Sequence, residues 1–161
     1  MFSELFRASL EFLWTGDSAV STKPETILLQ GSELLKPLFS EHGFTFAPLG
    51  GGSSSGGQFA YAEFRRADRR FEFHFRYSLG IVTYHLGSES ISHQEYMSSV
   101  LGTPGLSHYP GFSNDPLEAF RDLRDDLQSY CAEFLEGTNE TFLHRIEDAR
   151  SRWANRPKLP E

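Results

Sequence analysis

The amino-acid sequence predicts an α+β fold, in which an antiparallel β-meander of three to four strands is packed on one face by N- and C-terminal helices. Aromatic and polar residues alternate strictly from Phe71 to Tyr77, which is typical of a strand with one buried face. Before and after this region, apolar residues recur at three- and four-residue steps, as they do along amphipathic helices. The two periods together favour helices packed against a small sheet.

The composition is that of a globular protein. The chain has 161 residues, of which 39% are hydrophobic and 23% are charged. A chain of about 150 residues buries roughly 70% of its unfolded surface in one core. We therefore expect a single α+β domain over residues 1–154 and a loose C-terminal tail over residues 155–161.

Two helices are expected before the sheet. A first amphipathic stripe is formed by Phe2, Leu5, Phe6, Leu10 and Leu13. A second helix is predicted from Pro24, where a missing amide costs nothing, to Gly43. Pro37 lies inside this pattern and removes one helical hydrogen bond, so we expect a kink or a split there.

Residues 44–49 resemble a strand, and the tract Gly50–Gly57 follows directly. Glycine and serine offer few side chains for packing, so the tract predicts a flexible loop. A phosphate-binding loop would require a lysine followed by serine or threonine, or the spaced glycines of a dinucleotide site. Neither pattern is present. No nucleotide cofactor is therefore expected.

The next three strands can be placed in register by their apolar residues. A two-residue turn at Ala67–Asp68 gives the pairs Phe64–Phe71, Ala62–Phe73 and Ala60–Phe75. A two-residue turn at Leu79–Gly80 gives the pairs Tyr77–Val82, Phe75–Tyr84 and Phe73–Leu86. Slipping either pairing by one residue would bring polar side chains onto the apolar face, so we expect this register.

Helices are predicted again after the sheet. Ser92 and Glu95 form a capping box before a short helix that ends at Gly102, and a loop is expected from 103 to 114. Asp115 and Pro116 predict the start of a longer helix that ends at Gly137. A last helix is expected from Thr138 or Asn139 to Trp153.

The predicted register leaves one sheet face for polar side chains. The candidate binding residues on it are Tyr61, Glu63, Glu72, His74, Arg76 and His85. Tyr61, His74 and His85 are expected side by side across the strands, with Glu63 opposite Glu72. Two carboxylates in direct opposition repel each other, so they should turn toward nearby arginines or be tolerated for a reason.

This face has two interpretations. Glutamate and histidine side chains on neighbouring strands can converge on one cation or act as an acid–base pair, which would make Glu63, Glu72, His74 and His85 an enzyme site. A solvated face with paired charges explains the same residues. Because no close ligand spacing supports a metal motif, we favour the second interpretation and assign no metal.

Arginines are concentrated at one predicted hairpin tip. Arg65, Arg66, Arg69 and Arg70 flank the turn at 67–68 and are four of the 15 basic residues. Such a tip can bind phosphate or an acidic protein surface. A solvated turn whose charges protect the sheet edge is the favoured alternative.

Cys131 is the only cysteine, which excludes an intramolecular disulfide and indicates a reducing compartment, so a cytoplasmic location is expected. It falls on an apolar helix stripe and should be buried and unreactive. His93 should be exposed in the first turn of its helix.

The N-terminal apolar residues are broken by charges, so neither a signal peptide nor a membrane span is predicted.

The formal charge of -7 argues against general nucleic-acid binding and favours a basic protein partner. The segments 78–85, 92–97, 109–112 and 115–127 resemble small uncharacterised bacterial proteins, similar in style to immunity proteins of polymorphic toxin systems. The resemblance implies a non-catalytic protein whose partner is another protein, such as a toxin. We therefore expect a protein-binding domain, with a metal-dependent or acid–base enzyme as the alternative. An internal apolar ligand site and a homo-oligomer are compatible with the sequence.

Overall fold

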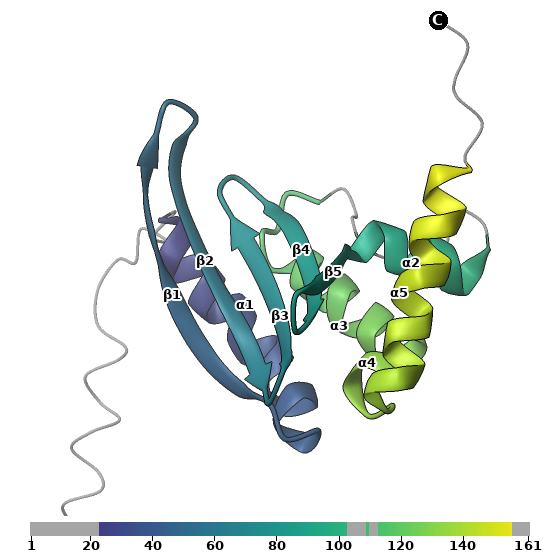
Figure 1. The fold of residues 1–161 in the computed structure, drawn as a ribbon. Coiled ribbons are helices and arrows are strands. Elements are labelled where there is room, and N and C mark those ends of the chain that lie inside the picture. Colours follow the sequence, from purple (N-terminus) through teal and green to yellow (C-terminus); the bar gives the residue numbers. More distant parts are fainter. Residues whose placement is uncertain (1–22, 103–108, 110–112, 156–161) are drawn as a thin grey trace, which may run out of the picture.

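The computed structural model describes residues 23–102, 109 and 113–155. The expected helix at 2–13, most of the expected loop at 103–114 and nearly all of the expected tail lie outside these residues. Five strands form one antiparallel sheet in the order β1-β2-β3-β4-β5, with helices before and after it (Figure 1). The elements are α1 (Pro24–Glu41), β1 (Thr45–Ser54), β2 (Gly57–Arg66), β3 (Arg69–Phe75), β4 (Leu79–Leu86), β5 (Glu89–Ser92), α2 (His93–Leu101), α3 (Glu118–Tyr130), α4 (Ala132–Leu135) and α5 (Asn139–Ala154).

The α+β class and the antiparallel sheet are confirmed, with five strands where three to four were expected. One face of the sheet is lined by phenylalanines that pack against the helices. Phe39 of α1 stacks on Phe64 of β2 with ring centroids 4.2 Å apart, and Phe120 of α3 contacts Phe73 and Phe75. All five side chains are at most 1% exposed. Within the described residues, no helix is long and apolar enough to cross a membrane.

Helix α1 runs unbroken through Pro37, so the expected split is wrong. Leu35 and Phe39 lie on either side of the proline, and both are fully buried. Burying two large side chains contributes about 3 kcal/mol or more, which is enough to offset one lost helical hydrogen bond.

The glycine–serine tract is not a separate loop, which corrects the expectation for Gly50–Gly57. Strand β1 continues to Ser54 and β2 begins at Gly57, so most of the tract belongs to a β-hairpin. A Cβ atom on Gly51 would lie 2.5 Å from the Phe59 carbonyl oxygen. Glycine is therefore required here by close backbone approach, a role that composition does not reveal.

The β2–β3 register agrees with the expected pairs. The β3–β4 register does not, because Phe73 faces Val82 and Phe71 faces Tyr84, and a bulge lies between Phe73 and Phe75. The pairing is shifted by four residues, since Phe73 was expected to face Leu86; because the shift is even, each strand keeps the expected face inward. The extra residues of the turn push Tyr77 out of the sheet, where its side chain is 80% exposed instead of buried.

The capping box of α2 is present, and Gly102 ends that helix in the left-handed conformation. Helix α3 begins at Glu118, two residues after the expected first helical residue Pro116, because Asp115 first forms a turn in which its side chain accepts a hydrogen bond from the Leu117 amide. A break at Cys131 then separates α3 from α4. The side chain of Thr138 caps α5, as expected.

Candidate functional site

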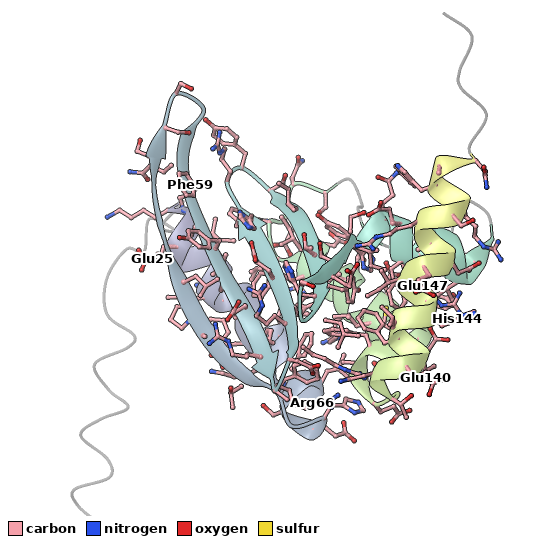
Figure 2. The ribbon with its side chains drawn as sticks, in the orientation of Figure 1. Glu25, Phe59, Arg66, Glu140, His144 and Glu147 are labelled. Carbon is pink, nitrogen blue, oxygen red and sulfur yellow. The ribbon has the colours of Figure 1, made fainter. Side chains whose placement is uncertain are left out.

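The described helices all lie on the phenylalanine side of the sheet, and they leave the other face uncovered (Figure 1). We call this uncovered side the open face. Figure 2 shows Phe59 and Arg66 at opposite ends of β2, and these two residues mark the two ends of the sheet discussed below. The expected binding residues Tyr61, His74 and Arg76 are each partly exposed on the open face.

A row of stacked rings crosses the open face. The Phe59 and Tyr61 rings lie 6.3 Å apart, and the Tyr61 and His74 rings lie 5.3 Å apart in nearly parallel planes. His74 Nε2 then lies 2.7 Å from Glu72 Oε1. Tyr61 and His74 are thus neighbours, as the register predicted.

His85 does not lie beside His74, because the shifted β3–β4 register places it opposite Arg70. Its Nε2 atom lies 3.4 Å from Glu72 Oε2, so the Glu72 carboxylate stands between the two imidazoles. An Arg70 nitrogen lies 3.3 Å from His85 Nδ1. Arginine can only donate, so Nδ1 is the acceptor in this contact. Burial first, and the Arg70 charge second, lower the pKa of His85, which favours the neutral imidazole.

Glu63 faces Glu72 across β2 and β3, as expected, but its carboxylate is turned away and fully buried. Arg65 forms an ion pair with it, and an Arg70 nitrogen lies 3.5 Å from its second oxygen. The two guanidinium groups therefore neutralise a charge that would be costly to bury alone. The predicted clash between the two glutamates is resolved by this arrangement.

The four arginines of the hairpin tip are only partly available for contact with an external partner. Arg66 donates to the carbonyl oxygens of His42 and Leu135, and Arg69 donates to those of Phe134 and Gly137 at 2.5 Å each. Both side chains thus satisfy carbonyl groups near helix ends instead of pointing outward. Arg65 and Arg70 remain on the open face, paired with Glu63.

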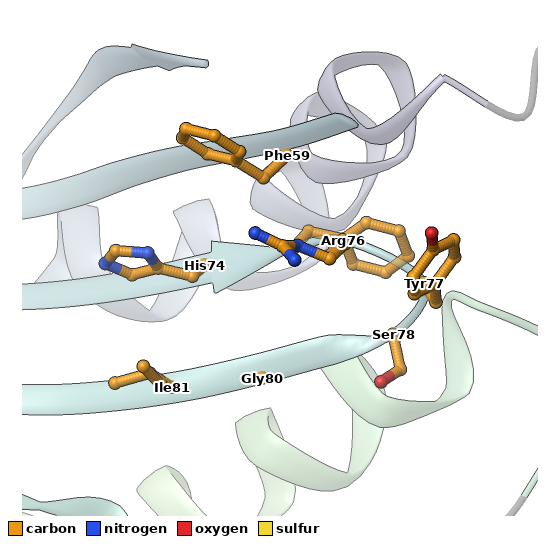
Figure 3. Close-up of a pocket in the computed structure, with 8 residues that line it drawn as sticks. Phe59, His74, Arg76, Tyr77, Ser78, Gly80 and Ile81 are labelled. Atoms are coloured by element: carbon orange, nitrogen blue, oxygen red, sulfur yellow. The ribbon is translucent and has the colours of Figure 1, made fainter. Parts of the chain in front are cut away.

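A pocket of about 460 Å³ lies at the other end of the open face (Figure 3). It is lined by Phe59, His74, Phe75, Arg76, Tyr77, Ser78, Gly80 and Ile81. Its volume is within the range of roughly 300–1,000 Å³ that is common for ligand sites. Ile81 is 65% exposed and Tyr77 is 80% exposed beside it. The sequence carries no signal for this pocket, because side-chain alternation does not reveal the bulge between Phe73 and Phe75 that leaves Tyr77 outside the sheet.

Within residues 23–102, 109 and 113–155, no group of three or more histidine, cysteine, aspartate or glutamate side chains is arranged to hold a metal ion. Glu63 contacts arginines and Glu72 contacts histidines, so the four residues of the expected cluster belong to two separate pairings. Of the four residues considered for acid–base chemistry, only Glu72, His74 and His85 have side chains in contact, through the Glu72 carboxylate.

A second polar group is fully enclosed by the helices. The Tyr84 hydroxyl lies 2.7 Å from His93 Nδ1 and 3.5 Å from Cys131 Sγ, and His93 Nε2 lies 3.1 Å from Asp126 Oδ2. His93 is 3% exposed, so the expectation of an exposed histidine is wrong. Burial raises the pKa of Cys131 to about 12, which leaves the thiol protonated and unreactive at neutral pH.

Comparisons with protein-family models, curated proteins and solved structures found no match for this chain. The residues of the open face and their geometry are therefore the basis for a functional proposal.

Proposed function

We propose that this chain is a non-catalytic protein-binding domain that holds its partner on the open face of the sheet. The observation that carries the proposal is the group of exposed apolar side chains at the pocket, Tyr77 and Ile81 above all, on a sheet face that no described helix covers. Isolated exposed apolar residues are common, but their concentration around a hollow is typical of interaction sites.

The residue types also fit a protein interface. Tyrosine and arginine are enriched among the residues that dominate binding energy, and the pocket places Tyr77 beside Arg76. The polar row from Tyr61 to His85 would form the surrounding rim. By the resemblance to immunity proteins, the partner is a toxin that the domain sequesters, in the cytoplasm.

The proposal is tested by affinity capture from the native organism with the wild-type chain and with two variants. Ile81→Asp places a charge in the pocket, whereas Leu143→Asp places one on α5, where the side chain is also exposed. We expect one protein to be captured by the wild type and by L143D but lost with I81D. Binding should then be reproduced with the purified partner, and equal binding of all three chains would refute the proposal.

A small acid–base enzyme is the second candidate, supported by the contacts of Glu72 with both imidazoles. A carboxylate that holds a histidine in place is a common arrangement for proton transfer. Metal analysis of protein purified without an affinity tag separates a metal-dependent form from the binding proposal, since stoichiometric zinc or iron would favour the enzyme. Glu72→Gln, at the rim, should weaken partner binding far less than I81D if the first proposal is correct.

A further inference from the structure

The arginines of the open face differ in what neutralises them. Arg65 and Arg70 both pair with Glu63. Arg76 instead donates to the Ser54 hydroxyl at 3.1 Å, and its guanidinium lies 5.6 Å from the centre of the Phe59 ring. Among the residues that the structure describes, no carboxylate forms an ion pair with Arg76. The pocket therefore contains a cation with room for an anionic partner.

The Arg76 side chain is held in place by the β1–β2 hairpin. A Cβ atom on Gly56 would meet an Arg76 nitrogen at 1.9 Å, so glycine is needed for this close contact. The Tyr77 hydroxyl donates to the Gly56 carbonyl oxygen at 2.8 Å and joins the two hairpin tips. Figure 3 shows the Arg76 head group directed between Phe59 and His74. The cation is thus positioned before any partner arrives, which lowers the ordering cost of binding.

The lining of the pocket limits what it can bind. Phe59, Tyr77 and Ile81 offer apolar surface, and Arg76 offers a planar group that suits a carboxylate. A phosphate would carry more charge than one guanidinium compensates, and His74 is already engaged with Glu72. One negative charge attached to an apolar group matches these features best.

On the basis of the proposed function, we infer that the pocket binds a segment of the protein partner in which an acidic side chain stands next to an apolar one. The carboxylate lies against Arg76, and the apolar group lies between Phe59, Tyr77 and Ile81. The formal charge of -7 favours a basic partner at long range. Contact at the pocket is instead decided by the nearest charge, which is Arg76.

Nuclear magnetic resonance titration of the full-length chain with two small peptides tests this inference. The probes are acetyl-phenylalanyl-glutamate amide and acetyl-phenylalanyl-glutamine amide, which differ only in the charge of one side chain. We expect saturable shifts at Arg76, Tyr77 and Ile81, with the glutamate peptide binding at least roughly tenfold more tightly, as one charge-assisted contact provides. Arg76→Gln should remove this preference. Arg152→Gln, a matched loss of charge on α5, should retain it.

Three results would overturn the inference: equal affinity for both peptides, shifts confined to Arg65 and Arg70, or the absence of saturable shifts. Shifts at the pocket that depend on protein concentration without peptide would also overturn it, because they would assign the pocket to a second copy of the chain. The proposed function is judged separately. If the captured partner is lost with I81D but is bound equally by the wild type and R76Q, the binding domain stands and the acidic segment does not.

Discussion

The two ends of the sheet use arginine in opposite ways. At the β2–β3 turn, Arg66 and Arg69 reach inward to helix carbonyl groups, and Arg65 and Arg70 share the buried Glu63. At the pocket end, Arg76 meets a hydroxyl group and an aromatic ring. At the β2–β3 turn, groups of the protein itself compensate the arginine charges. At the pocket, no described carboxylate forms an ion pair with Arg76.

This difference shows that a high density of charge in a sequence can serve contacts within the fold. Arg66 and the buried Arg69 donate to carbonyl groups of the fold, and Arg65 and Arg70 compensate the charge of the buried Glu63. Arg76, which lies beside apolar side chains, is the better candidate for binding, since no described carboxylate forms an ion pair with it. Substitutions at the two ends should therefore affect stability and binding differently.

The largest effect is expected for Arg69→Met. The substitution removes hydrogen bonds to the carbonyl oxygens of Glu133, Phe134 and Gly137 and to the Asn139 side chain, around a position that is 2% exposed. We expect the free energy of unfolding in urea to fall by about 3 kcal/mol. Arg76→Met is the matched control and should cost less than about 0.5 kcal/mol. Equal losses at both positions would remove the contrast between the two ends.

Gly57→Ala should have the next largest effect. Gly57 has a φ of 98°, which is costly for alanine, and a Cβ atom there would lie 2.4 Å from the Tyr77 hydroxyl oxygen. We expect a loss of about 2 kcal/mol in thermal or urea unfolding. Gly87→Ala is a suitable comparison, because its φ of 58° is also positive but nothing lies near its Cβ position. A similar cost at both glycines would mean that the contact with Tyr77 contributes nothing.

Side-chain alternation was sufficient to predict the fold class, the β2–β3 pairs and the residues of the open face. It could not determine the β3–β4 pairing, because a shift of four residues, like any even shift, keeps Phe71 and Phe73 on the same face. The length of the turn after Phe75 was the missing information, and it decides where Tyr77 lies.

Two further features were not predictable for different physical reasons. The glycine–serine tract was interpreted from composition, whereas its role depends on the approach of Phe59 from β2 and of Arg76 from the turn after β3. The direction of a long arginine side chain depends on acceptors that are distant in sequence, such as Gly137 for Arg69. Both are tertiary contacts, which local patterns do not contain.

A smaller effect is expected for Glu63→Gln. The substitution removes the carboxylate that pairs with Arg65 and Arg70, but these arginines are 53% and 37% exposed and can be solvated when left alone. We expect the free energy of unfolding to fall by about 1 kcal/mol. Binding of a captured partner at the pocket should stay unchanged. A loss of binding with intact stability would show that the β2–β3 turn end of the sheet also contacts the partner.

The smallest effect concerns the pH dependence of stability through His85. Burial and the Arg70 charge hold its pKa below 6.5, although Glu72 and Glu63 act in the opposite direction. The unfolded chain therefore binds a proton more readily than the folded protein, so this contribution is present above the unfolded pKa and is lost as the pH falls through the folded pKa. Urea unfolding at about pH 7.5 and about pH 5.5 should show wild-type stability falling relative to that of His85→Gln. Parallel changes in the two proteins would mean that the surroundings of His85 do not hold it neutral. The side chains at the β2–β3 turn end would then not compensate one another as fully as we infer.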